Sequence, residues 1–323
     1  MSLDRIRLAS LHDKVISAEE ASAFIEDGMT VGMSGFTRAG EAKAVPLALV
    51  KRAHTNPLKI TLITGASLGN DLDKQLTEAG VLARRLPFQV DNTLRKAINN
   101  GEVMFIDQHL SETVEQMRNL QLKKPDVAII EAVAITEDGG IIPTTSVGNS
   151  ASFAIFAEKV IVEINTNLSP AFEGLHDIYI PTYRPTRQPI PLTQVDERIG
   201  THAINIDPAK IVGIVINNDL HDSPSTVTAP DDETQGIADH LIAFFEKEVA
   251  EERLPKNLGP LQAGIGSIAN AVLTGLKDSN FEDLVMYSEV LQDCTFELID
   301  AGKMKFASGS SITLSAKYGE KVF

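Results

Sequence analysis

The sequence contains a single cysteine, Cys294, among its 323 residues. No disulfide can form within the chain, which is typical of proteins that fold in a reducing compartment. The N-terminal segment MSLDRIRLASLHDKV has no apolar stretch long enough for a signal peptide. No other run approaches the roughly 20 apolar residues that a membrane span needs. We therefore expect a cytoplasmic protein with no membrane partner.

Positive charge is also scarce. The chain has 29 Lys and Arg residues against 44 Asp and Glu residues, which gives a formal net charge of -15. It shows no basic patch or stripe, so nucleic acid is not an expected partner. Its 7 histidines form no HxxxH pair and have no cysteine partner, so we expect no metal site. The phosphate-binding motif G-x-x-x-x-G-K-[ST] is absent, which excludes ATP hydrolysis of that type.

The remaining pattern alternates short β-branched apolar runs with helix-length segments. The runs predicted as strands are 29–34, 59–64, 102–107, 126–131, 159–164 and 211–216. The segments predicted as helices are 44–54, 71–83, 110–120 and 149–157. Continuous apolar runs indicate strands that are buried on both faces, as in a mostly parallel sheet covered by helices. The expected fold class is therefore α/β.

Two later regions indicate how the chain is organised. Residues 179–194 hold four prolines and are predicted to be an extended excursion. This excursion is either a plain connection, or it is an oligomer arm or a wall of the active site. Residues 217–234 are rich in turn formers, which predicts a domain boundary. The helix predicted after it has apolar residues at helical spacing, namely Ile237, Leu241, Phe244, Phe245 and Val249. We therefore expect two domains, 1–225 and 233–323.

Glycine-containing turns follow several of the predicted strands, in 32–46, 62–71 and 144–154. Ligands of α/β sheets bind at the carboxyl ends of strands, so these turns are candidate binding loops. The segment 261–276, LQAGIGSIANAVLTGL, predicts a tight turn at Gly264 and Gly266 before a helix. Ser267 is a candidate N-cap, and Ile268 belongs to the predicted buried face of that helix. Such a turn either only begins the helix or also offers backbone N–H groups to an anion.

Glu289 follows the apolar run 284–287, which is predicted to be a strand, and Val290 and Leu291 are assigned to a helix that ends near Gly302. Glu289 is thereby placed at the first turn of this helix. A carboxylate there is either a routine favourable charge or a nucleophile held ionised at a strand end. Cys294, within the same predicted helix, is interpreted as a core thiol rather than a nucleophile.

Taken together, five segments resemble the acetyl-CoA hydrolase/transferase family within the class I CoA-transferases. They are GMTVGMSGFTRAGEAKAVP, TGASLGNDLD, AGIGSIANAVLTGL, MYSEVLQD and IDAGKMKFASGSSITLS. The resemblance follows essentially the whole chain, in order. It implies a two-domain α/β fold in which the second domain is incomplete here, because family members continue beyond the last segment.

The resemblance also implies functional roles for individual residues. Glu289 matches the family's glutamate nucleophile, and Gly65 and Ala66 match its oxyanion-hole loop. The segment that matches the coenzyme A-binding motif comprises Gly264, Ile265, Gly266, Ser267 and Ile268. Coenzyme A is a substrate in this family, and no permanently bound cofactor or metal is implied. The family further implies a homodimer that acts on an acyl-CoA and a small carboxylic acid.

Several functions stay open at this point. The main expectation is an acyl-CoA:carboxylate CoA-transferase that forms a glutamyl-CoA thioester, for example from acetyl-CoA or succinyl-CoA with acetate as acceptor. The first alternative is an acetyl-CoA hydrolase, in which water replaces the acid. The second is an inactive fragment that at most binds coenzyme A. The third and weaker alternative is a sugar- or nucleotide-binding α/β protein.

Overall fold

The computed structural model describes residues 2–225 and 231–322. The chain divides into two compact units. The first comprises Met1–Ile190 and Ile199–Ser223, and the second comprises Pro191–Arg198 and Pro224–Phe323. Part of the predicted boundary, residues 226–230, lies outside the described residues. The domain limits 1–225 and 233–323 stay a prediction.

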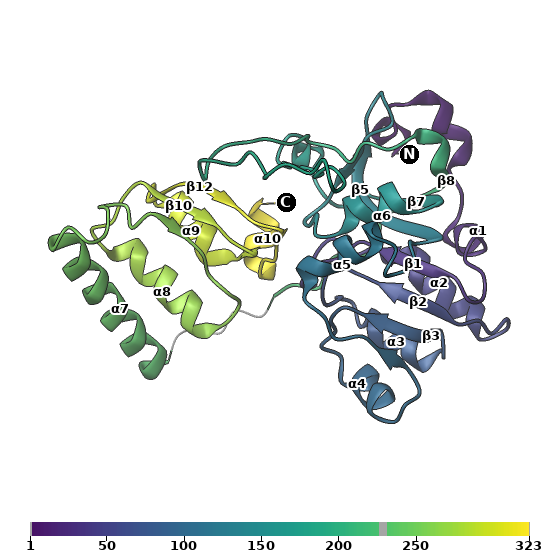
Figure 1. Ribbon diagram of the computed structural model, residues 1–323, viewed down its shortest axis with the longest axis horizontal. Helices are drawn as coiled ribbons and strands as arrows, with labels where there is room; N and C mark the ends of the chain where they lie inside the picture. The colour runs from purple at the N-terminus through teal and green to yellow at the C-terminus, as the bar shows by residue number, and fades with distance from the viewer. Residues whose placement is uncertain (1, 226–230, 323) are drawn as a thin grey trace. The chain divides into compact units, whose positions relative to one another are not determined.

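The first unit is built on an eight-stranded sheet (Figure 1). Its main path has the order β4-β3-β2-β1-β5-β7-β8, with β6 paired to β5. All the pairs are parallel except β5 with β6. The strands are β1 (Thr30–Met33), β2 (Ile60–Ile63), β3 (Leu82–Leu86), β4 (Met104–Phe105), β5 (Val127–Ile135), β6 (Ile141–Pro143), β7 (Lys159–Asn165) and β8 (Ile211–Asn217). From β1 the chain proceeds to β2 on one side, while β5 lies on the other. The β1/β5 boundary is therefore the point at which the strand order reverses, where α/β sheets form ligand crevices.

Helices cover both faces of this sheet (Figure 1). They are α1 (Ala18–Ser22), α2 (Ala44–Ala53), α3 (Leu72–Glu78), α4 (Asn92–Asn99), α5 (Leu110–Arg118) and α6 (Ser150–Phe156). Strand residues alternate between two apolar clusters, so that Ile129 joins the cluster of α1 to α4. Its neighbours Ala128 and Ile130 join the cluster of α5 and α6. This period of two explains why the strands are apolar throughout.

The predicted α/β class is confirmed, with three corrections at the level of elements. The predicted helix 71–83 ends at Glu78, because Gly80 adopts a φ of +69° and Leu82 begins β3. The sequence analysis missed β3 because its two arginines, Arg84 and Arg85, break the apolar run. It also missed α4, whose N-terminus is capped by the Asp91 side chain.

The second unit has a three-stranded parallel sheet of order β12-β10-β9. A separate pair, β11 with β13, is also parallel. The strands are β9 (Pro260–Leu261), β10 (Leu284–Tyr287), β11 (Val290–Leu291), β12 (Met304–Ser308) and β13 (Ser311–Ile312). The helices are α7 (Asp232–Ala250), α8 (Ser267–Asp278), α9 (Asp293–Asp300) and α10 (Ala316–Val322). The segment 179–194 forms neither helix nor strand and is largely exposed, as predicted for an extended excursion.

Helix α7 packs against α8 through one narrow face. Its inward residues Ala238, Ile242 and Phe245 belong to this contact, and the Ile242 side chain lies where a Cβ on Gly275 of α8 would stand. The predicted apolar face was therefore partly wrong. Ile237, Leu241 and Phe244 are exposed, because a helix with one neighbour buries a narrower stripe than the periodicity alone indicates.

Gly32 of β1 leaves the space that Phe153 of α6 fills. A Cβ at position 32 would lie 2.8 Å from Phe153 Cγ. We expect Gly32→Ala to lower the free energy of unfolding by about 1–3 kcal/mol through overpacking. Urea unfolding monitored in the first unit measures this cost. In a Phe153→Leu background the cost should shrink, and an unchanged cost would mean that the Phe153 contact is not its cause.

Candidate functional site

The second unit brings two of the predicted site segments to one edge of its sheet. Strands β9 and β10 run parallel, with Met286 opposite Leu261. The loop with Gly264 follows β9, and Glu289 follows β10. Because parallel neighbouring strands end at the same edge, these two loops leave the sheet side by side.

Two buried side chains hold these loops together. The Ser288 hydroxyl donates to the Ala263 carbonyl at 2.9 Å, and its oxygen accepts the Ala263 N–H at 3.3 Å. The Gln292 amide donates to the Gly264 carbonyl at 3.4 Å. The residues on either side of Glu289 thus fix the position of the glycine turn.

Glu289 lies between β10 and β11, which corrects its predicted place in a helix. Val290 and Leu291 form β11, and the helix α9 begins only at Asp293. The apolar pair had suggested helical periodicity, but it pairs with Ser311 and Ile312 of β13 instead. The Glu289 carbonyl accepts the Ser310 N–H at 2.8 Å, which fixes the backbone. The Glu289 side chain is exposed, and no hydrogen bond to it occurs within residues 2–225 and 231–322.

The turn Gly264–Ile268 is exposed and leads into α8. Gly266, not Ser267, is the N-cap of this helix, with φ 146° and no side-chain cap. The first N–H groups of α8 therefore have no side-chain acceptor and carry the positive end of the helix dipole. Ile268 is 50% exposed and not buried as predicted, because it lies in the first turn, outside the contact with α7. A Cβ at Gly264 or Gly266 would meet nothing within 4 Å, so the turn is open.

Gly65 and Ala66 lie in the first unit, in the loop that follows β2. Both are buried, and a Cβ on Gly65 would lie 2.8 Å from the Gly35 carbonyl oxygen. The Ala66 carbonyl accepts the Thr64 hydroxyl at 2.7 Å. In the described part of the chain, the N–H groups of Gly65 and Ala66 donate to no other protein group.

The same loop contains the spacing Gly65-x-Ser67-x-Gly69 of a serine nucleophile turn. Ser67 is only 5% exposed. No histidine in the described ranges hydrogen-bonds to its hydroxyl, and α3 begins only at Leu72. A serine mechanism needs a base beside the hydroxyl, so this spacing is not a serine-hydrolase site.

Sequence reasoning missed a cluster of charged groups in the first unit, at the strand-order reversal. The ammonium group of Lys43 lies 2.6 Å from Glu131 Oε1 and 2.6 Å from Asp222 Oδ1. Lys43 also donates to the Glu41 carbonyl at 2.7 Å. The Thr144 hydroxyl donates to Glu131 Oε2 at 2.6 Å. Acidic residues inside the apolar runs of β5 and β7 were the signal that could have revealed this cluster.

Glu163 of β7 caps the N-terminus of α2. Its carboxylate accepts the N–H groups of Lys43, Ala44 and Val45 at 2.9, 2.9 and 3.2 Å. Strand alternation puts Glu163 two residues after Ile161, on the face that α2 covers. A carboxylate at a helix N-terminus satisfies orphan donors and opposes the dipole favourably.

Burial shifts the protonation equilibria of this cluster. Desolvation, reinforced by the charge of Asp222, raises the pKa of Glu41 to about 8. Desolvation likewise raises the pKa of Glu131 to about 7, although Lys43 opposes the shift. Burial alone would lower the pKa of Lys43, but Glu131, Asp222 and Glu41 outweigh it and raise that pKa. The ammonium therefore stays charged while the carboxyl groups around it compete for protons.

Cys294 is buried in the core of the second unit, as predicted for a structural thiol. It is the second residue of α9, and its sulfur lies 3.5 Å from Asn270 Oδ1. Desolvation raises its thiol pKa to about 11. At neutral pH the group is protonated and shielded, which is unfavourable for a nucleophile.

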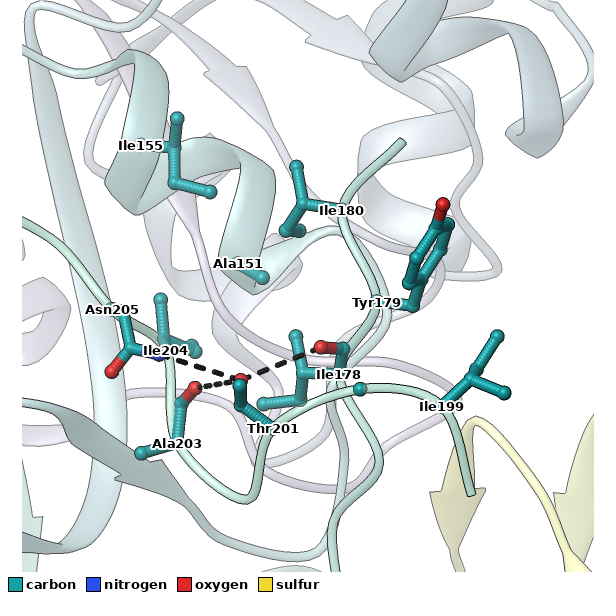
Figure 2. Close-up of a pocket in the computed structure, with 11 residues that line it drawn as sticks. Ala151, Ile155, Ile178, Tyr179, Ile180, Ile199, Thr201, Ala203, Ile204 and Asn205 are labelled. Carbon is teal, nitrogen blue, oxygen red and sulfur yellow. Dashed lines mark hydrogen bonds between the residues drawn. The ribbon is translucent and has the colours of Figure 1, made fainter. Parts of the chain in front are cut away.

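A surface pocket of about 270 Å³ lies in the first unit, and none of its lining residues is a predicted site residue (Figure 2). Ala151 and Ile155 of α6 form one wall, and the chain segments that contain Ile178 and Thr201 form the other. Its lining includes five isoleucines and contains no carboxylate, histidine, lysine or arginine. It lacks the groups that acyl transfer requires.

Within residues 2–225 and 231–322, no three His, Cys, Asp or Glu side chains gather so as to hold a metal ion. In the same ranges, no helix has both the length and the apolar character to cross a membrane.

Comparison with known proteins identifies the family. The acetyl-CoA hydrolase/transferase N-terminal domain matches residues 2–216, so the chain belongs to the acetyl-CoA hydrolase/transferase family. The chain is 46% identical over 313 residues to a succinyl-CoA:acetate CoA-transferase of Clostridium kluyveri, covering 96% of this chain and 58% of that protein. It is 43% identical over 331 residues to an acetyl-CoA hydrolase of Kluyveromyces lactis, covering 99% of this chain and 63% of that one.

A solved structure shows the same fold. RipA from Yersinia pestis aligns with a TM-score of 0.70 and 18% identity, covering 97% of this chain and 67% of that chain. The predicted family resemblance and the α/β fold are thus confirmed. The chain spans about 60% of the length of the two curated relatives, 58% and 63% respectively.

The Ser288 hydroxyl provides a test of how the glycine turn is held. We expect Ser288→Ala to lower the free energy of unfolding of the second unit by about 1–2 kcal/mol, because the Ala263 carbonyl and N–H lose their partner. Amide hydrogen exchange in 262–267 should accelerate as well. Ser310→Ala is the matched control, because no hydrogen bond of the Ser310 hydroxyl occurs in the described structure. Equal exchange in both variants would contradict this role of Ser288.

The burial of Cys294 gives a second test. We expect iodoacetamide to modify the native thiol at pH 7.5 more than about a hundredfold more slowly than the thiol of the denatured chain, because little thiolate forms and access is poor. Mass spectrometry at timed intervals measures both rates. Modification of the native chain at the denatured rate would show that the thiol is exposed and reactive.

Proposed function

We propose that this chain carries the acyl-CoA site of a CoA-transferase, with Glu289 as the nucleophile. The proposed reaction moves coenzyme A between an acyl-CoA, such as acetyl-CoA or succinyl-CoA, and a small carboxylic acid. The intermediate is a glutamyl-CoA thioester. Family membership supports the reaction class, since relatives carry the names CoA-transferase and acetyl-CoA hydrolase.

One observation favours these residues above all others. Glu289 and the turn Gly264–Ile268 follow neighbouring parallel strands, and Ser288 and Gln292 fasten the turn beside the glutamate. The glutamate is exposed and has no protein partner in the described ranges. A nucleophile that must meet a substrate carbonyl needs this freedom, whereas its backbone must be fixed.

The turn Gly264–Ile268 suits a coenzyme A substrate for three physical reasons. Its glycines leave open space for a bulky ligand. The uncapped N-terminus of α8 offers N–H groups and a positive dipole end to the negative groups of coenzyme A. Ile265 and Ile268, 59% and 50% exposed, add apolar surface for its uncharged parts.

The proposed chemistry has balanced steps. The Glu289 carboxylate attacks the thioester carbonyl, the C–S bond breaks, and an acyl–glutamyl anhydride and a CoA thiolate result. The thiolate then attacks the glutamyl carbonyl, which forms the glutamyl-CoA thioester and releases the carboxylate of the first acyl group. An incoming carboxylate reverses both steps and leaves as the new acyl-CoA. No proton transfer by a base is needed, because nucleophiles and leaving groups are anions throughout.

Each tetrahedral state carries an oxyanion that needs hydrogen-bond donors. We propose that the free N–H groups of Gly65 and Ala66 supply them, since their loop is held rigidly and they have no other acceptor in the described structure. Preorganised donors cost no reorganisation during the reaction, and loss of one costs about 10²–10³ in rate.

The hydrolase alternative uses the same residues. Water in place of the incoming carboxylate would hydrolyse the intermediate, and relatives include proteins named acetyl-CoA hydrolase. Product analysis with and without added acetate separates the two: exchange of acyl groups marks the transferase, and loss of thioester without an acceptor marks the hydrolase.

Domain limits, assembly and location also belong to this proposal. We assign 1–225 to the N-terminal CoA-transferase domain and 233–323 to the start of the C-terminal one. A homodimer and a cytoplasmic location stay predictions. Size-exclusion chromatography with light scattering tests the dimer.

The decisive experiment is intact-protein mass spectrometry after the folded chain is mixed with succinyl-CoA or acetyl-CoA. We expect a covalent CoA adduct on the peptide that contains Glu289, because the glutamyl thioester is the proposed resting intermediate. Glu289→Gln should abolish the adduct and leave the far-UV circular dichroism unchanged, since the side chain is exposed.

The matched control is Glu282→Gln, an exposed carboxylate just before β10. This variant should form the adduct at the normal level. An adduct that persists in Glu289→Gln would overturn the nucleophile assignment. The absence of an adduct from the folded wild-type chain would overturn the enzymatic proposal for this chain and leave the fragment alternative.

A further inference from the structure

The reaction proposed above makes no use of the charged cluster at the strand-order reversal of the first unit. Within this cluster, Glu41 belongs to the loop that follows β1. Its side chain is completely buried. One of its oxygens, Oε1, accepts the Asn70 side-chain amide at 2.9 Å. The other, Oε2, is buried and has no hydrogen-bond partner among residues 2–225 and 231–322. An ionised carboxylate left this way would lose hydration without compensation.

The position of the Glu41 side chain is set by two glycines. A Cβ on Gly35 would lie 2.9 Å from Glu41 Cβ, and a Cβ on Gly69 would lie 2.3 Å from Glu41 Oε1. The carboxyl group therefore rests directly against the backbone of the loop that follows β2. It cannot swing out toward solvent without displacing one of the two loops.

Three charged groups act on Glu41 from the elements around it: Asp222 after β8, Lys43 in its own loop, and Glu131 of β5. Lys43 is already engaged by Glu131 and Asp222, each at 2.6 Å. Glu163 of β7 lies beyond Lys43, where it caps α2. One ammonium group thus faces four carboxyl groups, and it cannot neutralise them all.

Asp222 accepts two hydrogen bonds from groups other than Lys43. Its Oδ2 accepts the Gly40 N–H at 3.1 Å and the Thr145 hydroxyl at 2.7 Å. Its Oδ1 faces Lys43. Within the cluster, Glu41 therefore combines complete burial with an oxygen that receives no hydrogen bond in the described ranges.

We propose that Glu41 is a positioning residue that works as a neutral carboxylic acid, with a proton on Oε2. The Gly40 N–H, which donates to Asp222 Oδ2 at 3.1 Å, joins the loops that follow β1 and β8. Asn70, bonded to Glu41 Oε1 and to Ser223, joins the loop that follows β2 to them. In the same loops, the Arg38 N–H donates to the Ser67 carbonyl at 3.0 Å.

The loop that is held in this way carries Gly65 and Ala66. The consequence for catalysis rests on the proposed function, but the proton itself does not. Deprotonation of Glu41 would put an uncompensated buried negative charge against the loop that follows β2 and push these loops apart. Proton linkage gives the sign: the folded state holds a proton that the unfolded chain releases above the ordinary glutamate pKa. Stability therefore falls as the pH rises from about 4.5 toward 8, the pKa of folded Glu41.

The first experiment measures the proton directly by ¹³C NMR of the chain labelled at glutamate side-chain carboxyl carbons. Glu41→Gln identifies the Glu41 signal by its loss. We expect this signal at the protonated position at pH 6.5, with a transition near pH 8. A transition in the ordinary range of exposed glutamates, between about 4 and 5, would overturn the proposal.

The second experiment compares the pH dependence of unfolding. Between pH 5.5 and 7.5, the wild-type unfolding constant of the first unit should rise more steeply than that of Glu41→Gln, by about tenfold per pH unit for one proton. Glu131 and Glu163 are present in both proteins, so the difference reports Glu41 together with its effect on Glu131. Glu78→Gln, an exposed control on α3, should keep the wild-type slope. Equal slopes in wild type and Glu41→Gln would contradict the proton on Glu41.

The third experiment tests positioning by amide hydrogen exchange of residues 64–70. Glu41→Gln keeps a neutral group of similar size that can still accept from Asn70, so it should retain wild-type protection at pH 6.5. Glu41→Ala should lose at least tenfold in protection. If Glu41→Ala does not fold, Glu41→Gln at pH 9, where the wild-type loops loosen, should be better protected than wild type. Equal protection in every comparison would refute the positioning role, whether or not the chain forms a CoA adduct.

Discussion

The loops at the carboxyl end of the first sheet depend on one buried ammonium group. Lys43 stands at the start of α2 and holds Glu131 of β5 and Asp222 after β8 within 2.6 Å. Removal of one partner from such a cluster leaves an uncompensated buried charge, which costs about 3–5 kcal/mol. A purely apolar layer would be easier to fold, but it would not fix three separate loops against one point.

Both units hold the loops at the ends of their strands in place, but with different kinds of bond. In the first, ionised and protonated carboxyl groups tie loops to a large, fully covered sheet. In the second, whose sheet has three short strands, neutral hydrogen bonds from Ser288 and Gln292 do the work.

Much of the first unit could be predicted from the sequence because its central strands are apolar on both faces. The strand β3 could not, since its Arg85 is buried by a pairing with Asp73 that only the fold reveals. In the second unit, Val290 and Leu291 suggested a helix, and their pairing with β13 involves residues 21 positions away. The predicted roles of Glu289, Gly65 and Ala66 came from family resemblance. Periodicity alone left each of them open.

The close fit of Glu41 against Gly69 has a consequence for sequence variation. The glycine at 69 is required by a side chain 28 positions earlier, not by its own backbone, since its φ is not in the left-handed region. A chain with a small residue at 41 would free position 69 to carry a side chain. The two positions are therefore expected to change together during evolution, and a substitution at 69 alone would expel the carboxyl group from the cluster.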